Sequence, residues 1–308
     1  MKFGRTDQPG SIDFTLPADH PATGEILRQP REEKPLNAYV GCAKWNKQEL
    51  KNFYPRGTKD ELAYYSTQFN SIELNATFYR IPDRSQVISW KDKTPEGFKF
   101  FPKINQGISH IKRLNEVEQL VEAYCDNISN FEEKLGMVFL QLHDNFGAKN
   151  QERLVHFIAE FPKSIPLAVE IRNGQWCGDA RLSSEIFELF EKFNVTNILV
   201  DTAGRRDLLH MRLTTPSTFI RYVGANDPAK DRERLDDWMG RLRIWVDQGL
   251  REINFFVHQN IELESPFLAA YFIGKLNQEF GLTLKIPNLL DNWTEFYPPV
   301  QNGLTLDF

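Results

Sequence analysis

Short apolar runs, each bounded by polar or turn residues, alternate along the chain with longer stretches in which apolar residues recur every three or four positions. The short runs have the length of β-strands, and the longer stretches have the period of amphipathic α-helices. Because a helix-patterned stretch separates successive strands, the strands are expected to be parallel and covered on both faces. The predicted strands are residues 38–42, 71–80, 98–103, 137–142, 167–171, 197–201, 218–223 and 253–257.

Most of the predicted helices begin at side chains that can cap a first turn. Ser, Thr, Asp or Asn before a helix, often with Glu or Gln three residues later, satisfies backbone N–H groups that have no partner inside the helix. Glycine after the last turn ends a helix, as expected at Gly281. The predicted starts are Thr58 with Glu61, Asp83 with Gln86, Asn115 with Glu118, Ser183 or Ser184, and Ser265 followed by Pro266.

Eight alternations of strand and helix over about 250 residues are typical of a TIM (β/α)8 barrel. We therefore predict one α/β domain of this kind at residues 37–308, in which the residues after about 286 cover one end of the barrel. A doubly wound parallel sheet is the alternative. Against it, the turn Gly41-Cys42-Ala43-Lys44 contains one glycine and lacks the glycine-rich pattern that binds dinucleotides.

Residues 1–36 are predicted to form an extension outside the barrel. The segment contains several prolines and shows no hydrophobic periodicity, so we expect it to be irregular and to contribute no barrel strand. It could be a disordered tail, or an arm across the surface anchored by Phe14 and Leu16.

The second predicted strand is interrupted by polar residues. Ile72 and Leu74 alternate with Glu73 and Asn75, although a strand covered on both faces usually reads as a continuous apolar run. Burying such groups without partners costs several kcal/mol. Glu73 and Asn75 are therefore expected to be paired or to perform a function.

In a TIM barrel, the active site lies at the carboxyl ends of the strands. Polar and charged residues follow almost every predicted strand, and those two positions apart share one side of a strand. We expect Glu73, Asn75, Lys103, Glu170, Arg172 and Arg221 to converge on one site. The catalytic candidates are Glu73, Glu170, Lys103 and His110, and the candidates for substrate binding are Lys44, Trp45, Asn75, Tyr79, Gln141, Arg172, Trp176, Asp201, Arg221, His258 and Asn260.

Other interpretations of these residues remain open. The charged residues could form a purely structural ring of ion pairs. Glu73, Glu170, Asp201 and His258 are types of residue that bind divalent ions, but no HxH or HExxH motif occurs, and no metal is assigned. Cys42 could act as a nucleophile, although a small buried cysteine more often serves packing.

Composition limits the possible partners. The chain has 41% hydrophobic and 26% charged residues, which is ordinary for a globular protein. A net charge of -5 argues against general nucleic-acid binding, because such proteins are usually basic. The few, scattered cysteines, the lack of an apolar leader and the lack of a membrane-length apolar run predict a reduced, cytoplasmic protein that does not enter membranes.

Several of these motifs together resemble domain of unknown function 72, the YecE-like family, over residues 38–280. The resemblance implies a TIM barrel but no particular reaction or cofactor. Departures after the fourth, seventh and eighth strands, such as His143-Asp144-Asn145, indicate that the site differs there. The matching segments are Gly41 to Trp45, Phe53-Tyr54-Pro55, Glu73 to Pro82, Phe98-Lys99-Phe100, Lys103 with Ile108-Ser109-His110, and Glu170-Ile171-Arg172 before Trp176.

The sequence thus favours an enzyme that acts on a small anionic or phosphorylated substrate at the carboxyl ends of the strands. In this hypothesis, Glu73 or Glu170 is the general acid or base and His110 carries protons. Lys103, Arg172 and Arg221 bind the anion. The alternative is a protein that binds or senses a small ligand at the same site without catalysis.

Overall fold

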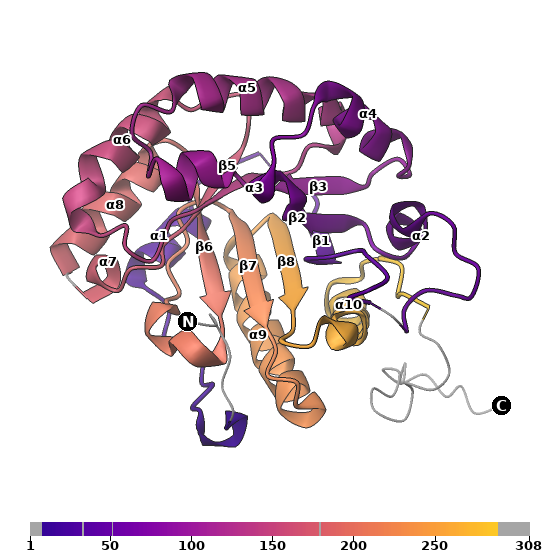
Figure 1. Cartoon of the computed structure of the whole chain (residues 1–308). Coiled ribbons are helices and arrows are strands. Elements are labelled where there is room, and N and C mark those ends of the chain that lie inside the picture. Colours follow the sequence, from indigo (N-terminus) through magenta and orange to yellow (C-terminus); the bar gives the residue numbers. More distant parts are fainter. Residues whose placement is uncertain (1–7, 33, 51, 179, 289–308) are drawn as a thin grey trace.

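The computed structural model describes residues 8–32, 34–50, 52–178 and 180–288 (Figure 1). The predicted cover formed by the residues after about 286 lies mostly outside this part of the chain. The strands are β1 (Asn37–Cys42), β2 (Ser71–Leu74), β3 (Lys99–Pro102), β4 (Val138–Gln141), β5 (Leu167–Glu170), β6 (Thr196–Asp201), β7 (Ser217–Val223) and β8 (Glu252–His258). The α-helices are α1 (Pro21–Leu27), α2 (Glu61–Gln68), α3 (Ala76–Tyr79), α4 (Arg84–Asp92), α5 (Glu118–Ile128), α6 (Gln151–Glu160), α7 (Gln175–Gly178), α8 (Ala180–Lys192), α9 (Pro228–Gln248) and α10 (Ser265–Phe280).

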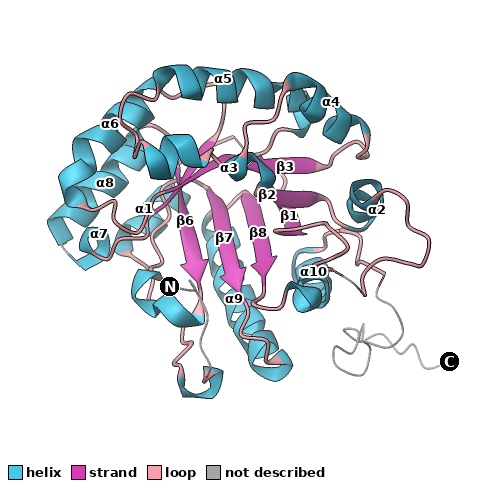
Figure 2. Ribbon diagram, in the orientation of Figure 1, coloured by secondary structure: helices cyan, strands magenta, loops and turns pink. Residues whose placement is uncertain are grey.

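The strands pair in parallel, as predicted, but their hydrogen bonds do not form one continuous ring. Six form a curled sheet in the order β1-β8-β7-β6-β5-β4, and β2 pairs with β3 in a separate sheet. Isolated bridges at Phe100–Leu135 and Lys103–Phe139 link the end of β3 to the β4 region. Helices surround the strands (Figure 2). The α/β prediction is confirmed, and the barrel prediction is confirmed as far as a curled half-barrel.

Two apolar cores follow from the alternation of side chains along the strands. The larger core lies between the strands and the helices. The smaller core lies on the opposite faces of the strands, where the Phe101 ring centroid is 5.8 Å from that of Phe219 and 4.8 Å from that of Phe256. Its members are Phe101, Met137, Phe139, Ala168, Ile198, Val200, Phe219 and Phe256, with Tyr39 packed against them.

The second strand is shorter than predicted. It ends at Leu74, because Asn75 has helical backbone angles and starts the short helix α3. The Thr77 hydroxyl then donates to the carbonyls of Leu74 and Lys103 at 3.0 and 2.7 Å. This turn places residues 76–79 over the end of β3 instead of extending the sheet.

One of the predicted helix caps is confirmed, and the others are displaced from the observed helix starts. Asp83 caps α4 by accepting from the Gln86 backbone N–H, as predicted. Thr58 does not cap α2, whose cap is Asp60. A capping residue must directly precede the first helical residue. The Asn115 prediction is wrong for the same reason, since α5 begins after Val117 without a side-chain cap. The serines proposed as a cap lie inside α8, and Ser265 is itself the first residue of α10.

The described part of the N-terminal segment lies against the domain and includes the helix α1. Thr23 is buried, and its hydroxyl donates to the Met211 carbonyl at 2.7 Å and accepts from the Leu213 N–H at 3.0 Å. Asp19 accepts from Arg241 and from the Trp245 Nε1 of α9. Phe14 is also buried, with its ring 4.2 Å from the Arg234 guanidinium. These contacts favour the arm over the disordered tail, with Phe14 as an anchor.

The position of this arm compensates for a short connection. After β6 the chain forms only the 3-10 segment η5 (Ala203–Leu208) before β7. Arg206 of η5 donates to the carbonyls of Phe14 and Thr15 at 3.0 and 3.1 Å. Helix α1 contacts α9, the helix after β7. The arm therefore supplies helical cover that the connection after β6 lacks.

Candidate functional site

A polar layer lies directly beyond the inner apolar core, toward the carboxyl ends of the strands. All of its members except Glu73 follow an inner-core residue by two positions, and therefore point to the same side of the strand as that residue. Glu73 joins the layer from β2, where it is in register with Phe101. The other pairs are Phe101 with Lys103, Phe139 with Gln141, Ala168 with Glu170, Phe219 with Arg221, and Phe256 with His258.

Glu73 is fully buried and accepts hydrogen bonds from three side chains. Arg221 Nε and Nη2 donate to its two oxygens, both at 2.9 Å. Asn75 Nδ2 donates to Oε1 at 2.8 Å, and His258 Nε2 lies 2.9 Å from Oε2. A carboxylate can only accept, so Nε2 carries the hydrogen of His258 in this contact. The bidentate Arg221 contact connects β2 to β7 across the interior.

Glu170 is the second fully buried carboxylate. It accepts from Arg221 Nη1 at 2.6 Å and from Arg172 Nε. Gln141 Nε2 lies 3.0 Å from both of its oxygens. One guanidinium, that of Arg221, therefore bridges the two carboxylates.

Lys103 completes the network and is held differently. Its Nζ donates to Gln141 Oε1 at 2.8 Å and lies 4.3 Å from the centroid of the Phe78 ring. Neither buried carboxylate is within ion-pair distance of this nitrogen, because Arg221 and Arg172 occupy them. The six residues expected to converge thus belong to one hydrogen-bonded network. Five of them are joined directly, and Lys103 is joined through Gln141.

The pKa values divide these groups into two classes. Burial alone would raise the pKa of both carboxyls, but Arg221 and His258 hold the pKa of Glu73 well below its usual range, and Arg172 and Arg221 lower that of Glu170 to about 2. Burial, reinforced by Arg221, lowers the pKa of Lys103 to about 7. Near neutral pH the carboxylates stay charged, whereas the lysine titrates.

His110 lies beside the network, in contact with Phe78. Its ring is edge-on to Phe78 at 4.9 Å and to His143 at 5.1 Å. Burial and the neighbouring Lys103 lower the pKa of His110 to about 4, so its imidazole is neutral at physiological pH. Phe78 and His143 were not assigned a catalytic or substrate-binding role from the sequence. The only signal for them was their position next to Tyr79 and after the fourth strand.

Six other predicted site residues lie outside the network. Lys44 pairs with Glu49 at 2.7 Å, and the Trp45 ring packs edge-on against Trp90. Tyr79 is 71% exposed and Asn260 is also exposed. Trp176 is buried and donates from Nε1 to the Phe146 carbonyl at 2.7 Å.

Asp201, the sixth, belongs to a separate buried cluster on the helix-facing side of β6. Ile198 and Val200 face the inner core, so Asp201 points the opposite way. It accepts from the Trp238 Nε1 at 2.8 Å and pairs with Arg234 at 2.9 Å. The sequence placed it at the correct strand end but not on the correct face.

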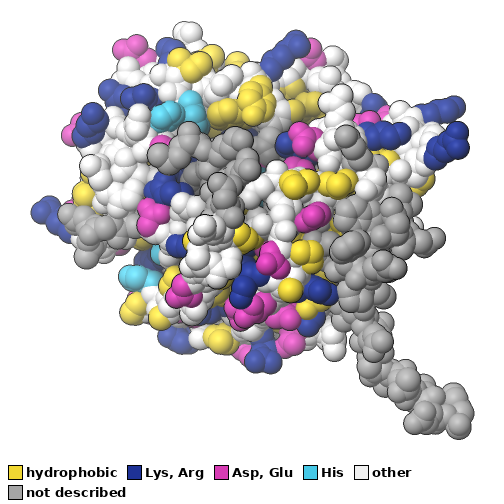
Figure 3. Space-filling view, turned by 60° about the horizontal axis from the view of Figure 1, so that its bottom comes forward, with side chains coloured by type: hydrophobic (Ala, Val, Ile, Leu, Met, Phe, Trp, Pro, Cys, Tyr) yellow, Lys and Arg dark blue, Asp and Glu magenta, His cyan; other side chains and the backbone are white. Residues whose placement is uncertain are grey.

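The face of the molecule toward which β6, β7 and β8 point carries charges of both signs (Figure 3). Figure 3 shows the molecule from the end toward which β6, β7 and β8 point, and acidic and basic side chains are interspersed over this face. Within the described residues, no group of three or more His, Cys, Asp or Glu side chains is placed to hold a metal ion. No helix in the same part of the chain is long and apolar enough to cross a membrane.

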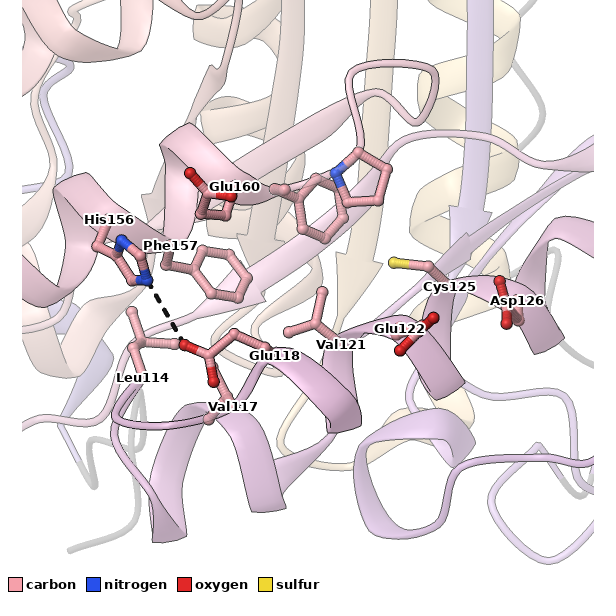
Figure 4. A pocket seen from close by; sticks show the side chains of 12 residues that line it. Leu114, Val117, Glu118, Val121, Glu122, Cys125, Asp126, His156, Phe157 and Glu160 are labelled. Atoms are coloured by element: carbon pink, nitrogen blue, oxygen red, sulfur yellow. Dashed lines mark ion pairs between the residues drawn. The ribbon is translucent and has the colours of Figure 1, made fainter.

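A hollow of about 250 Å³ lies elsewhere, between α5 and α6 (Figure 4). Its floor is apolar, with Val121 and Phe157, and its rim includes Glu118, which pairs with His156 at 3.5 Å. Both partners are more than half exposed, so this ion pair contributes little to stability. None of the predicted site residues lines this hollow.

Comparisons with known proteins agree with the fold. Residues 39–290 match the family described as protein of unknown function DUF72. The chain is 26% identical to UPF0759 protein YecE of Escherichia coli K12 over 228 residues, covering 67% of this chain and 81% of YecE. It is 29% identical to UPF0759 protein YunF of Bacillus subtilis 168 over 147 residues, or 45% of this chain and 51% of YunF.

A crystal structure of a DUF72 family protein from Enterococcus faecalis V583 has a similar fold. The two superpose with a TM-score of 0.63 at 18% identity, over 80% of this chain and 99% of that one. The strand pattern, the motif from Glu73 to Pro82 and the match over residues 39–290 lead to one conclusion: the chain belongs to the DUF72 family.

Proposed function

We propose that this protein is an enzyme that acts on a small anionic substrate at the polar layer, with Lys103 as the group that meets the substrate. The observation that carries the proposal is the unequal pairing of the network. Arg172, Arg221 and Lys103 are the cations of the network, and Lys103 is the one among them without a carboxylate partner in the described part of the chain. Glu73 and Glu170 are its buried carboxylates, and Asp144 lies 3.9 Å from Arg172 at the edge. The arginines take both carboxylates. An anion beside Lys103 would complete the pairing.

The two carboxylates suit a supporting role better than that of general acid or base. A general acid or base works best with a pKa near the working pH. Both carboxyls are instead held in the charged state by their arginines, with a pKa of about 2 for Glu170. Lys103, with a pKa of about 7, is the group of the network suited to proton transfer. In this proposal Glu73 and Glu170 hold Arg221 in place.

The proposed anion site can be tested by ligand-induced thermal shifts. Inorganic phosphate and succinate should raise the melting temperature of the protein more than sodium chloride of equal ionic strength. Lys103→Met should lose this response, because it removes the cation without a carboxylate partner. Lys99→Met is the matched control, since Lys99 begins the same strand and donates to the Glu133 carbonyl.

Anion binding should also be accompanied by proton uptake near pH 7.5. A bound anion raises the pKa of a neighbouring ammonium. Calorimetric binding heats should therefore vary with the ionisation enthalpy of the buffer. Equal shifts in chloride, or a full response in Lys103→Met, would refute the anion site.

A second candidate function is a ligand-binding or sensing protein without catalysis. It is kept because both buried carboxylates are fully engaged by arginines and are therefore poorly suited to acid–base catalysis. Both proteins would bind the anion at Lys103. Only the enzyme would convert a substrate, so product formation by the parent and its loss in Lys103→Met separate the two.

We further propose that the two sheets are parts of a single eight-stranded barrel wall. In support, Phe101 of β3 packs on Phe219 of β7 and Phe256 of β8, and the Asn70 side chain bonds to Val40 N–H and the Ala38 carbonyl of β1 at 3.0 and 2.8 Å. A crystal structure with the β2–β3 pair detached from β1 would contradict this.

A further inference from the structure

We infer that Lys103 is a nucleophile that forms an imine with a small molecule carrying both a carbonyl and an anionic group. The substrate class is thus an oxo acid or the phosphate ester of an aldehyde or ketone. This inference rests on the proposed anion site and deepens it, because it assigns a covalent step to the same amine.

The first argument is the contrast between two buried lysines. Lys134 is a saturated ammonium, whose Nζ donates to the carbonyls of Lys91 and Thr94 at 2.8 and 2.6 Å and to the Thr94 hydroxyl at 3.3 Å. Lys103 is equally buried, with 8% of its surface exposed, but its Nζ has one described acceptor, Gln141 Oε1. An ammonium has three hydrogens to donate. Lys134 is therefore arranged as a structural cation, whereas Lys103 is not.

The second argument is the electrostatic setting of the Lys103 amine. It lies on the Phe78 ring, with Phe139 at 5.9 Å, in the same layer as the Arg221 guanidinium. Burial and a neighbouring cation both favour the neutral amine, the form whose lone pair attacks a carbonyl. The pKa of about 7 agrees with this geometry, since roughly half of the amine is neutral at that pH.

Groups suited to the rest of the substrate belong to the same network or contact the Phe78 ring on which the amine lies. Arg172 lies at the edge of the network, with its side chain 14% exposed and the Asp144 carboxylate 3.9 Å from Nη1. Guanidinium groups suit carboxylate and phosphate. His110 shares the Phe78 ring with Lys103, and its Nδ1 lies 2.9 Å from the Ser109 hydroxyl. A neutral imidazole can accept a proton at one nitrogen and donate from the other.

The proposed step is a condensation without change of oxidation state. The Lys103 lone pair forms a bond to the carbonyl carbon, and the carbonyl π electrons move to oxygen. A proton passes from nitrogen to that oxygen, through His110 or water, and gives a carbinolamine. The hydroxyl then takes a second proton from His110 or water and leaves as water, while the nitrogen lone pair forms the C=N bond. The remaining N–H proton returns to the same group, which gives the neutral imine. One carbonyl and one amine thus give one imine and one water.

Reductive trapping tests the inference on the full chain. The protein is incubated at pH 7.5 with sodium cyanoborohydride and pyruvate, glyoxylate or dihydroxyacetone phosphate, and analysed by intact mass and peptide mapping. We expect one adduct, at Lys103, that adds the mass of the carbonyl compound less one oxygen atom. The carboxylate probes and the phosphate probe distinguish the two forms of anion.

Matched variants and a neutral probe sharpen the result. Lys103→Arg should abolish the adduct while keeping a cation in the network, and Lys99→Arg should retain it. Acetone, a carbonyl without charge, should label at least tenfold more slowly than pyruvate. At subsaturating probe concentration, the trapping rate should rise with pH with a midpoint near 7, as the amine of the free protein loses its proton.

The inference and the anion site fail in different ways. Lys103-dependent thermal shifts without any adduct at Lys103 would overturn the imine and leave the anion site intact. Absence of both would overturn both. Labelling spread evenly over surface lysines, or equal labelling of the Lys103→Arg variant, would also overturn the assignment of Lys103 as the nucleophile.

Discussion

Replacing Glu170 with glutamine should destabilise the protein at neutral pH and make its stability less sensitive to acid. Glu170 is fully buried and neutralises part of the charge of Arg221 and Arg172. In Glu170→Gln the buried Arg221 and the partly buried Arg172 share one carboxylate fewer. Removing one partner of a buried ion pair typically costs about 3–5 kcal/mol.

The pKa of Glu170 gives an independent magnitude. Its folded value of about 2 lies below the ordinary 4.5, so the charged form stabilises the fold above pH 4.5, and this contribution is lost as the pH falls toward 2. The difference of about 2.5 pKa units corresponds to roughly 3 kcal/mol at pH 7, of which about 2 kcal/mol should be lost by pH 3. The two routes agree on the size of the effect.

Urea unfolding followed by tryptophan fluorescence at pH 7 and pH 3 measures this difference. The gap between the parent and Glu170→Gln should shrink by about 2 kcal/mol at the lower pH. Glu49→Gln is the control, because that carboxylate is partly exposed and pairs only with Lys44, so its substitution should change little. A Glu170→Gln variant as stable as the parent at pH 7, or a gap that does not change with pH, would refute the reasoning.

Three further substitutions test other parts of the structure. Phe14→Ala should lower the free energy of unfolding by about 3 kcal/mol, and clearly more than Leu16→Ala, because only Phe14 is buried. Lys103→Met should stabilise the protein by roughly 4 kcal/mol more at pH 6 than at pH 10. With a pKa of about 7 in the folded protein, the charged Lys103 destabilises the fold below that pH, and this cost vanishes as the pH approaches 10.5. Urea unfolding that gives the same stability difference between variant and parent at both pH values would contradict this. Gly41→Ala should abolish folding, since a Cβ there would meet a backbone carbonyl of β2 at 2.2 Å, whereas Gly240→Ala, with nothing within 4 Å, should raise the melting temperature slightly.

Strand positions and the polar layer were predictable because both depend on the alternation of side chains. Glu73, Glu170 and Arg221 occupy positions where a covered strand would be apolar, and the network explains their presence. The same parity, applied to Ile198 and Val200, would have placed Asp201 on the helix side. The face on which Asp201 lies was therefore predictable from the sequence.

Other features could not be predicted from local pattern. The end of β2 at Leu74 depends on a hydrogen bond from Thr77 to Lys103, a residue 26 positions later. The docking of the arm depends on partners that lie far along the chain, such as Met211 for Thr23. The number of hydrogen-bond acceptors near the Lys103 amine likewise depends on which distant residues pack around it. Contacts between distant segments leave no periodic signal in the sequence.

The N-terminal arm has a consequence for the order of folding. Its contacts join residues separated by 188 to 226 positions, from Thr23 with Met211 to Asp19 with Trp245. On a ribosome, the arm is made before the segments that it binds, and its binding surface is complete only after α9 has been made. Until then the apolar residues Phe14, Ile26 and Leu27 lack their final partners. The arm therefore reaches its place only after α9 has been made, and its apolar residues stay without their final partners until then.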